Sequence, residues 1–206
     1  MSKIRILIAD DHAVVRMGLA ALFSAKKDLE VVGQAKDGES AVRETVRLRP
    51  DVVIMDLMMP RKDGIEATQE ILRRSPDAKV IVLTSYATSD GIVQALKAGA
   101  VGAVLKSAEN SELVSAIRRI AAGNRYVSPE IESLIASDPP ISGLTGRQSE
   151  ILQSLSLGLT NKDIARQLGI SERSVEEHVV KLLSKIGASN RTEAVGIALR
   201  RHLLKM

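Results

Sequence analysis

The stretch Asp51-Val-Val-Ile-Met-Asp56 decides the fold, because it is an apolar run of strand length that ends on a carboxylate. Pro60 and the pair Asp63-Gly64 follow shortly afterwards and supply turn chemistry. A continuous apolar run bounded by turn signals is typical of a parallel strand that is buried on both faces. A carboxylate at the end of such a strand faces the crevice in which open α/β sheets bind ligands. We therefore place the candidate functional site at Asp56.

The same kind of run recurs along the first part of the chain, with helical spacing between the runs. Strand patterns lie at 4–10, 31–35, 51–56, 79–84 and 102–106, and helical patterns lie at 13–25, 39–48, 65–74, 89–98 and 111–122. Five strands alternating with five helices predict an α/β fold, a doubly wound, flavodoxin-like parallel sheet covered on both faces. The strand order expected for this fold is 2-1-3-4-5.

The rest of the chain has a different pattern. Residues 126–143 contain several prolines and serines and are predicted to be a linker, within which a short helix fits at 131–136. Residues 144–206 show no strand pattern and are predicted to form a small all-α domain of four helices. Its two middle helices are short and meet at Gly169, which is the pattern of a helix-turn-helix. The expected domains are therefore 1–125 and 144–206, joined by the linker.

Composition excludes several classes of protein. The 206 residues include no cysteine, so we expect neither disulfides nor a thiolate metal site. No apolar stretch is long enough to span a bilayer, and the N-terminus runs directly into a strand pattern. We therefore expect a cytoplasmic protein without a signal peptide or a membrane anchor. One Phe, two Tyr and no Trp argue against a stacking surface for single-stranded nucleic acid.

Polar side chains end four of the predicted strands. Asp10 and Asp11 end the first strand, Asp56 the third, Thr84 the fourth and Lys106 the fifth. Because parallel strands end at one edge of a sheet, we expect these side chains to lie together. Each has an ordinary explanation when taken alone, such as a helix cap or a solvated lysine, but the coincidence at four strand ends favours a site.

The chemistry of such a cluster points to phosphoryl transfer. Three neighbouring carboxylates need a cation in order to stay ionised, and Mg²⁺ prefers oxygen ligands. Lys106 and the Thr84 hydroxyl, together with the metal, could hold the oxygens of a phosphoryl group. Asp56 would then be the nucleophile, because an aspartate can form an acyl phosphate.

Two sets of motifs resemble known domains. Asp10-Asp11, Asp56 to Pro60, Asp63-Gly64, Thr84-Ser85 and Lys106 resemble the receiver domain of two-component response regulators. The segments 144–152, 161–165, 170–172 and 191–194, with Val175 and His178, resemble the LuxR-type DNA-binding domain. The pairing is similar to NarL/FixJ-type transcription regulators and covers almost the whole chain.

The resemblance implies a role for each residue of the first motif set. A sensor histidine kinase would phosphorylate Asp56. Mg²⁺ would be held by Asp11, Asp56 and the backbone carbonyl of Met58, with Asp10 binding it directly or through water. Thr84 and Lys106 would stabilise the phosphate and act in the switch. The chain departs from the family at Ala103, where such receivers usually carry Tyr or Phe. Tyr86 is the candidate replacement for that aromatic.

The second helix of the helix-turn-helix also departs from the family, because Glu176 stands where Lys is usual and Glu177 follows it. The predicted DNA contacts are Thr160, Asn161, Lys162, Ser171, Arg173, Glu176, Glu177, Val180, Lys181 and Lys185. Two carboxylates weaken attraction to phosphate, although Glu can accept a hydrogen bond from cytosine N4. The alternative is that the pair only stabilises the helix, since Glu177 and Lys181 are four residues apart.

We expect a transcription regulator that binds double-stranded DNA and forms a homodimer on phosphorylation. A dimer doubles the contacts of one short recognition helix, and the apolar residues Ala194, Ile197 and Ala198 of the last helix are expected at its seam. Two alternatives remain. A phosphatase using Asp56 is disfavoured because Met58 offers no general acid. An adaptor that has lost DNA binding is favoured only by the two glutamates.

Overall fold

The computed structural model describes residues 3–85, 88–141, 144–201 and 203–204. Contacts divide the chain into two compact units, Met1–Asp138 and Pro139–Met206. In the described part of the chain, no helix combines the length and the apolar character needed to cross a membrane.

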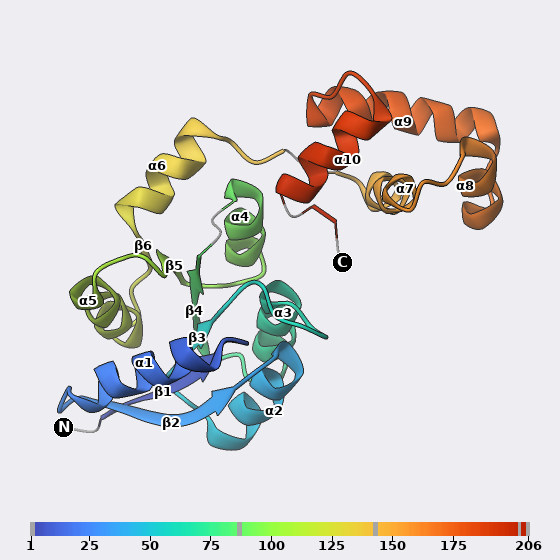
Figure 1. Cartoon of the computed structure of the whole chain (residues 1–206). Helices are drawn as coiled ribbons and strands as arrows, with labels where there is room; N and C mark the ends of the chain where they lie inside the picture. The colour runs from blue at the N-terminus through green and yellow to red at the C-terminus, as the bar shows by residue number, and fades with distance from the viewer. Residues whose placement is uncertain (1–2, 86–87, 142–143, 202, 205–206) are drawn as a thin grey trace. The chain divides into compact units, whose positions relative to one another are not determined.

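The first unit is built on a parallel sheet with the strand order β2-β1-β3-β4-β5-β6 (Figure 1). The strands are β1 (Ile4–Ala9), β2 (Leu29–Ala35), β3 (Val52–Met55), β4 (Lys79–Thr84), β5 (Gly102–Leu105) and β6 (Tyr126–Val127). The order of the first five strands confirms the predicted topology. In register, Ala9 pairs with Met55 and Thr84 with Leu105, so the strands end along one edge.

The prediction of five strands was wrong by one. The described residues contain a sixth strand, β6, which pairs Gly102 with Tyr126 and Ala103 with Val127. It lies in the segment expected to be a linker, as does the helix α6 (Pro129–Ser137). A strand of two residues is too short to produce an alternating pattern, so only its pairing with β5 reveals it.

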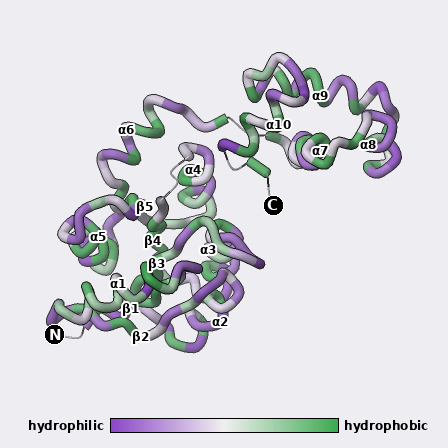
Figure 2. The backbone as a smooth tube through the Cα atoms, in the orientation of Figure 1, coloured by the Kyte–Doolittle hydropathy of each residue, from purple (hydrophilic) through white to green (hydrophobic). Residues whose placement is uncertain are grey.

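Helices cover both faces of the sheet. They are α1 (Ala13–Ser24), α2 (Gly38–Leu48), α3 (Gly64–Arg74), α4 (Ser89–Lys97) and α5 (Asn110–Ala121), followed by α6. The helices α1 and α5 bury Phe23 and Ile117 against one face, while α2 and α3 bury Val42 and Ile71 against the other (Figure 1). The strands themselves are apolar, and Figure 2 shows the hydrophobic stretches gathered in the middle of this unit.

A separate apolar cluster joins α4 and α6 to the sheet. Ile92 of α4, Ile131 of α6 and Ala103 of β5 are all fully buried in it. The backbone N–H of Ser128 donates to the Ala103 carbonyl at 3.0 Å, and the Ser128 hydroxyl caps α6. The small side chain at Ala103 therefore lies beneath a helix that packs on this edge of the sheet.

The second unit is helical, as predicted. It contains α7 (Gly146–Ser156), α8 (Asn161–Leu168), α9 (Glu172–Ile186) and α10 (Arg191–Arg200). Thr145, Thr160, Ser171 and Asn190 cap the four helices with their side chains. Gly169 ends α8 at φ 65°, a left-handed conformation that glycine adopts without strain, and so makes the sharp turn into α9.

Candidate functional site

Asp10, Asp56 and Lys106 meet at the carboxyl edge of the sheet. Backbone hydrogen bonds hold both aspartates in the extended ladder, from Asp56 N to Ala9 O at 2.8 Å and from Asp10 N to Ala35 O at 3.1 Å. The Lys106 Nζ lies 2.7 Å from Asp10 Oδ2 and 2.9 Å from Asp56 Oδ2. Asp10 is 2% exposed and Asp56 is 4% exposed, so this ion pair is largely shielded from water.

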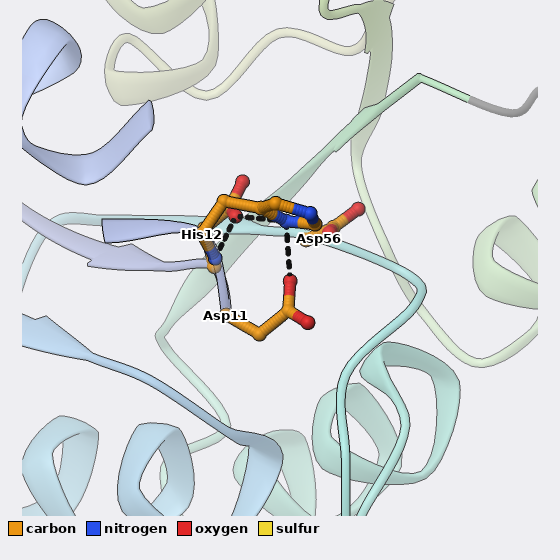
Figure 3. A group of neighbouring side chains, drawn as sticks. Asp11, His12 and Asp56 are labelled. Carbon is orange, nitrogen blue, oxygen red and sulfur yellow. Dashed lines mark hydrogen bonds and ion pairs between the residues drawn. The ribbon is translucent and has the colours of Figure 1, made fainter. Parts of the chain in front are cut away.

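Asp11 and His12 close the same group from the solvent side. The His12 backbone N–H donates to Asp10 Oδ1 at 2.8 Å, and His12 Nδ1 lies 2.6 Å from Asp11 Oδ1 (Figure 3). His12 was not predicted from sequence. Its position directly after the Asp-Asp pair was the available signal, but nothing in the sequence indicates that the ring turns back toward the carboxylates.

The surroundings of Asp56 disfavour its charged form. Burial raises the pKa of its carboxyl, and the like charge of Asp10 adds to the rise. Hydrogen bonds from Lys106 and from the Met58 backbone N–H act against this rise without cancelling it. Burial by itself would lower the pKa of Lys106, but its bonds to Asp10 and Asp56 outweigh burial and raise it. Lys106 is therefore held as a cation.

The residues present fit a divalent cation. Asp10, Asp11, His12 and Asp56 each offer a ligand atom, and these atoms lie within 4.8 Å of one another. One Lys106 ammonium serves both Asp10 and Asp56, and Asp11 adds a third carboxylate to the group. Carboxylate oxygens are the donors that Mg²⁺ prefers.

The loop after β3 is shaped by close backbone packing. A Cβ atom at Gly64 would lie 2.1 Å from the Asp56 carbonyl oxygen, so only glycine fits there. The Gly64 N–H donates to Leu57 O at 2.9 Å, and Asp63 caps α3 by accepting from Glu66 N. These contacts place Met58, which is 42% exposed, beside the Asp56 carboxylate.

The other residues that the sequence singled out for this site are Thr84, Ala103 and Tyr86. Thr84 is fully buried at the end of β4, and its carbonyl accepts from Lys106 N at 2.9 Å. Ala103 is buried under α6. Tyr86, the predicted replacement for the missing aromatic, lies outside the described residues.

Two family models match this chain. The model for the response regulator receiver domain matches residues 6–118, more than half of the chain, and the model for bacterial regulatory proteins of the luxR family matches 142–198. The chain is a two-component response regulator. The luxR-family match and the transcriptional regulators among its relatives identify it as a transcription regulator rather than an enzyme.

Full-length relatives support this assignment. The response regulator is 42% identical over 213 residues to the transcriptional regulatory protein LiaR of Bacillus subtilis, covering 98% of this chain and 99% of LiaR. It is 35% identical over 214 residues to the oxygen regulatory protein NreC of Staphylococcus carnosus, covering 97% and 99% of the two chains.

Solved structures of response regulators match along almost the whole length of the chain. The response regulator ChrA of a heme-sensing two-component system is 38% identical, with a TM-score of 0.60, and the match covers 98% of this chain and 100% of ChrA. RcsB of Salmonella enterica serovar Typhimurium, bound to a promoter in the presence of the phosphomimetic BeF₃⁻, is 25% identical with a TM-score of 0.73. That match covers 97% of this response regulator and 99% of RcsB.

The predicted DNA contacts of the response regulator lie on α8, α9 and the turns before them. Lys162, Ser171, Arg173, Glu176, Glu177, Val180, Lys181 and Lys185 are exposed, as is Thr160, while Asn161 is half-buried. Several of these side chains also have partners within the unit. Thr160 forms a capping box with Asp163, Asn161 accepts from Arg191 at 2.8 Å, and Lys185 donates to Gln148 at 3.0 Å.

The two glutamates of α9 are both exposed to solvent. Glu177 forms an i,i+4 ion pair at 3.5 Å with Arg173, which precedes it in the helix. The pair considered from the sequence was with Lys181, which follows it. An ion pair this exposed contributes little to stability. Glu176 and Glu177 therefore remain available to face a partner.

The expectation of an apolar dimer face on α10 needs correction. Ala194 and Ala198 are fully buried in the core of their own unit, and Ile197 packs partly against it. A unit of four short helices has a small core, and it uses the small side chains of α10 to bring that helix close to α7 and α9. Leu199, which is 45% exposed, is the large apolar residue that α10 presents to solvent among the described residues.

Proposed function

We propose that Asp56 accepts a phosphoryl group from a sensor histidine kinase, and that this switches dimerisation and sequence-specific DNA binding of a cytoplasmic transcription regulator. The observation that carries the proposal is the pairing of Lys106 with two buried carboxylates at the ends of β1 and β3. The pairing holds the Lys106 ammonium against Asp56, which is the nucleophile in this proposal. Membership of the response regulators and full-length similarity to transcriptional regulators support the same function.

The residues of the site divide the chemistry between them. An Asp56 carboxylate oxygen forms the new bond to phosphorus, while the bond from phosphorus to the kinase's histidine nitrogen breaks and its electron pair stays on that nitrogen. Lys106 and the Thr84 hydroxyl hold phosphoryl oxygens as charge builds on them. Mg²⁺, when bound, neutralises the phosphoryl oxygens. Asp10, Asp11, Asp56 and the Met58 carbonyl would hold it.

The proposal also assigns roles in DNA binding to residues of the second unit. Lys181, Lys185, Arg173 and the start of α8 would contact phosphates, while Glu176, Glu177 and Val180 face base edges. Because β6 and α6 belong to the first unit, which ends at Asp138, we propose that the linker is shorter than the predicted segment 126–143. Two copies of the chain would bind two half-sites.

A phosphorylation experiment tests the proposal directly. Purified chain is incubated with acetyl phosphate and Mg²⁺, and its intact mass and light scattering are recorded. We expect one added phosphoryl group, loss of the adduct in EDTA, and dimers in the phosphorylated sample. The Asp56→Asn variant should remain unmodified, whereas Asp77→Asn, which removes an exposed carboxylate of the same type, should behave as wild type. An adduct in Asp56→Asn would contradict the assignment.

A second candidate, a protein-binding adaptor without DNA binding, is favoured by the exposed Glu176 and Glu177. Repulsion between these carboxylates and DNA phosphates lowers affinity. Titration of the phosphorylated chain with duplex DNA at several salt concentrations separates the two functions. Binding that weakens with salt supports the regulator, and the absence of binding at low salt supports the adaptor.

A further inference from the structure

We propose that His12 is a fourth side-chain ligand of the cation site beside Asp56, and that it shifts the preference of the site toward divalent transition metals. The inference rests on the proposed function, because the same carboxylates hold the cation there. It adds a nitrogen ligand to a site whose other side-chain donors are oxygens.

The position of the ring is the first argument. His12 Nδ1 lies 2.6 Å from Asp11 Oδ1 and 3.3 Å from Asp10 Oδ1, and the ring turns toward the carboxylates (Figure 3). Its ligand atom belongs to the group of four that lie within 4.8 Å of one another, together with that of Asp56. A cation bound by these carboxylates would thus lie within reach of the imidazole.

The local backbone gives a second argument. His12 occupies the N-cap position of α1, where Ser, Thr, Asp or Asn would normally accept from the helix. Its side chain forms no capping hydrogen bond within the described residues, and its backbone N–H is bound to Asp10 Oδ1 at 2.8 Å. The helix therefore does not use the imidazole, while the backbone bond ties His12 to one of the carboxylates.

Metal chemistry makes the difference measurable. Carboxylates suit Mg²⁺ and Mn²⁺, whereas imidazole suits Ni²⁺, Zn²⁺ and Cu²⁺. The His12 side chain is 67% exposed, so a metal ion can reach the ring from solvent. Nδ1 is the ring nitrogen that lies beside the carboxylates, and it is the atom that would bind the metal.

Calorimetry on the untagged full-length chain tests the inference. Mg²⁺ and Ni²⁺ are titrated separately into wild type, His12→Asn and His178→Asn. Loss of a ligand should weaken Ni²⁺ binding by about tenfold or more in His12→Asn, whereas Mg²⁺ binding should change by less than about twofold because imidazole is a poor ligand for it. Asn is itself favoured at an N-cap, so α1 is retained. His178→Asn controls for a histidine in the second unit and should match wild type.

Spectroscopy supplies the second readout. Pulsed EPR of the Mn²⁺-loaded chain should show coupling to an imidazole ¹⁴N in wild type and in His178→Asn, and should lose it in His12→Asn. Three results would overturn the inference: no ¹⁴N coupling in wild type, equal weakening of Mg²⁺ and Ni²⁺ in His12→Asn, or no weakening of Ni²⁺. Failure of the proposed function is recognised separately, because wild type with Mg²⁺ and acetyl phosphate would then gain no phosphoryl group.

Discussion

At the scale of single residues, Asp56 combines burial with negative charge. It is almost fully buried, and the neighbouring carboxylate of Asp10 repels it, so that burial and repulsion raise the pKa of Asp56 above 3.8, its usual value. Lys106 compensates only in part, because one ammonium serves both carboxylates. A nucleophile held in this way gains from a bound cation, which would offset the repulsion between the two carboxylates.

The cost of burying the Asp56 charge predicts that Asp56→Asn is more stable than wild type at pH 7 in EDTA. A carboxyl whose folded pKa is raised costs no stability below its unfolded pKa. The cost grows as the pH rises from the unfolded to the folded pKa, and it is complete above the folded pKa. We expect the variant to be more stable by on the order of 1 kcal/mol in urea unfolding at pH 7, with the difference vanishing below about pH 4. Lys106 keeps Asp10 as a partner in the variant. A less stable Asp56→Asn at pH 7 would show that the ion pair outweighs the cost of burial.

A second prediction at this scale concerns the lifetime of phosphorylated Asp56, and it rests on Met58. It lies two residues after Asp56, is half-exposed beside that carboxylate, and has no group that orients a water for hydrolysis. We expect spontaneous dephosphorylation over hours rather than seconds, because help from a general base typically contributes about 10²-fold or more. The measurement is the decay of the added mass after removal of acetyl phosphate. A half-life below about one minute, faster than the lack of a base allows, would show that another group positions the water.

At the scale of elements, β6 and α6 complete the first unit. They pair with β5 and fill the space above Ala103 with Ile131, and the Ser128 N–H donates to the Ala103 carbonyl. Ala103 stands where an aromatic residue is usual, and its small side chain leaves room for Ile131 of α6. A large ring at that position would compete with Ile131 for the same space.

The packing predicts that Ile131→Ala destabilises the first unit. Ile131 is fully buried, so its truncation leaves a cavity, and we expect a loss of about 2–5 kcal/mol in unfolding free energy. Glu132→Ala, which changes the exposed neighbour on the same helix, should cost less than about 0.5 kcal/mol. Both are measured by urea unfolding of the full-length chain followed by circular dichroism. Equal stability of the two variants would mean that α6 does not dock on β5 in solution.

At the scale of the whole molecule, two compact units share a chain whose formal net charge is only +4. The exposed face of α9 carries Glu176 and Glu177 beside Arg173 and Lys181, so its charges largely balance. Non-specific attraction to DNA should therefore be weak, and recognition should depend on base contacts to an unusual degree.

Glu176→Lys tests this balance. The substitution should raise affinity for random-sequence DNA and make binding more salt-dependent, because each neutralised phosphate contributes about −0.9 to the slope of log K against log salt. It should also reduce discrimination between the preferred site and random DNA. Glu30→Lys, which makes the same charge change at an exposed position of β2, serves as the control. If both variants bind random DNA as wild type does, Glu176 does not face the duplex and α9 docks in a different rotation.

The amino-acid sequence alone determined the alternating elements, the strand order and the edge at which Asp10, Asp11, Asp56 and Lys106 meet. It could do so because hydrophobic periodicity and strand ends are local features, and parallel strands end on one side. Only the tertiary structure decided that the His12 ring turns back onto the carboxylates, that β6 and α6 pack on the sheet, and that Ala194 and Ala198 of α10 are buried. The His12 ring depends on a single side-chain rotamer and β6 on pairing with a distant strand, and neither leaves a periodic signal in the chain. The helical spacing of Ala194 and Ala198 is visible in the sequence, but only packing decides which surface covers that face.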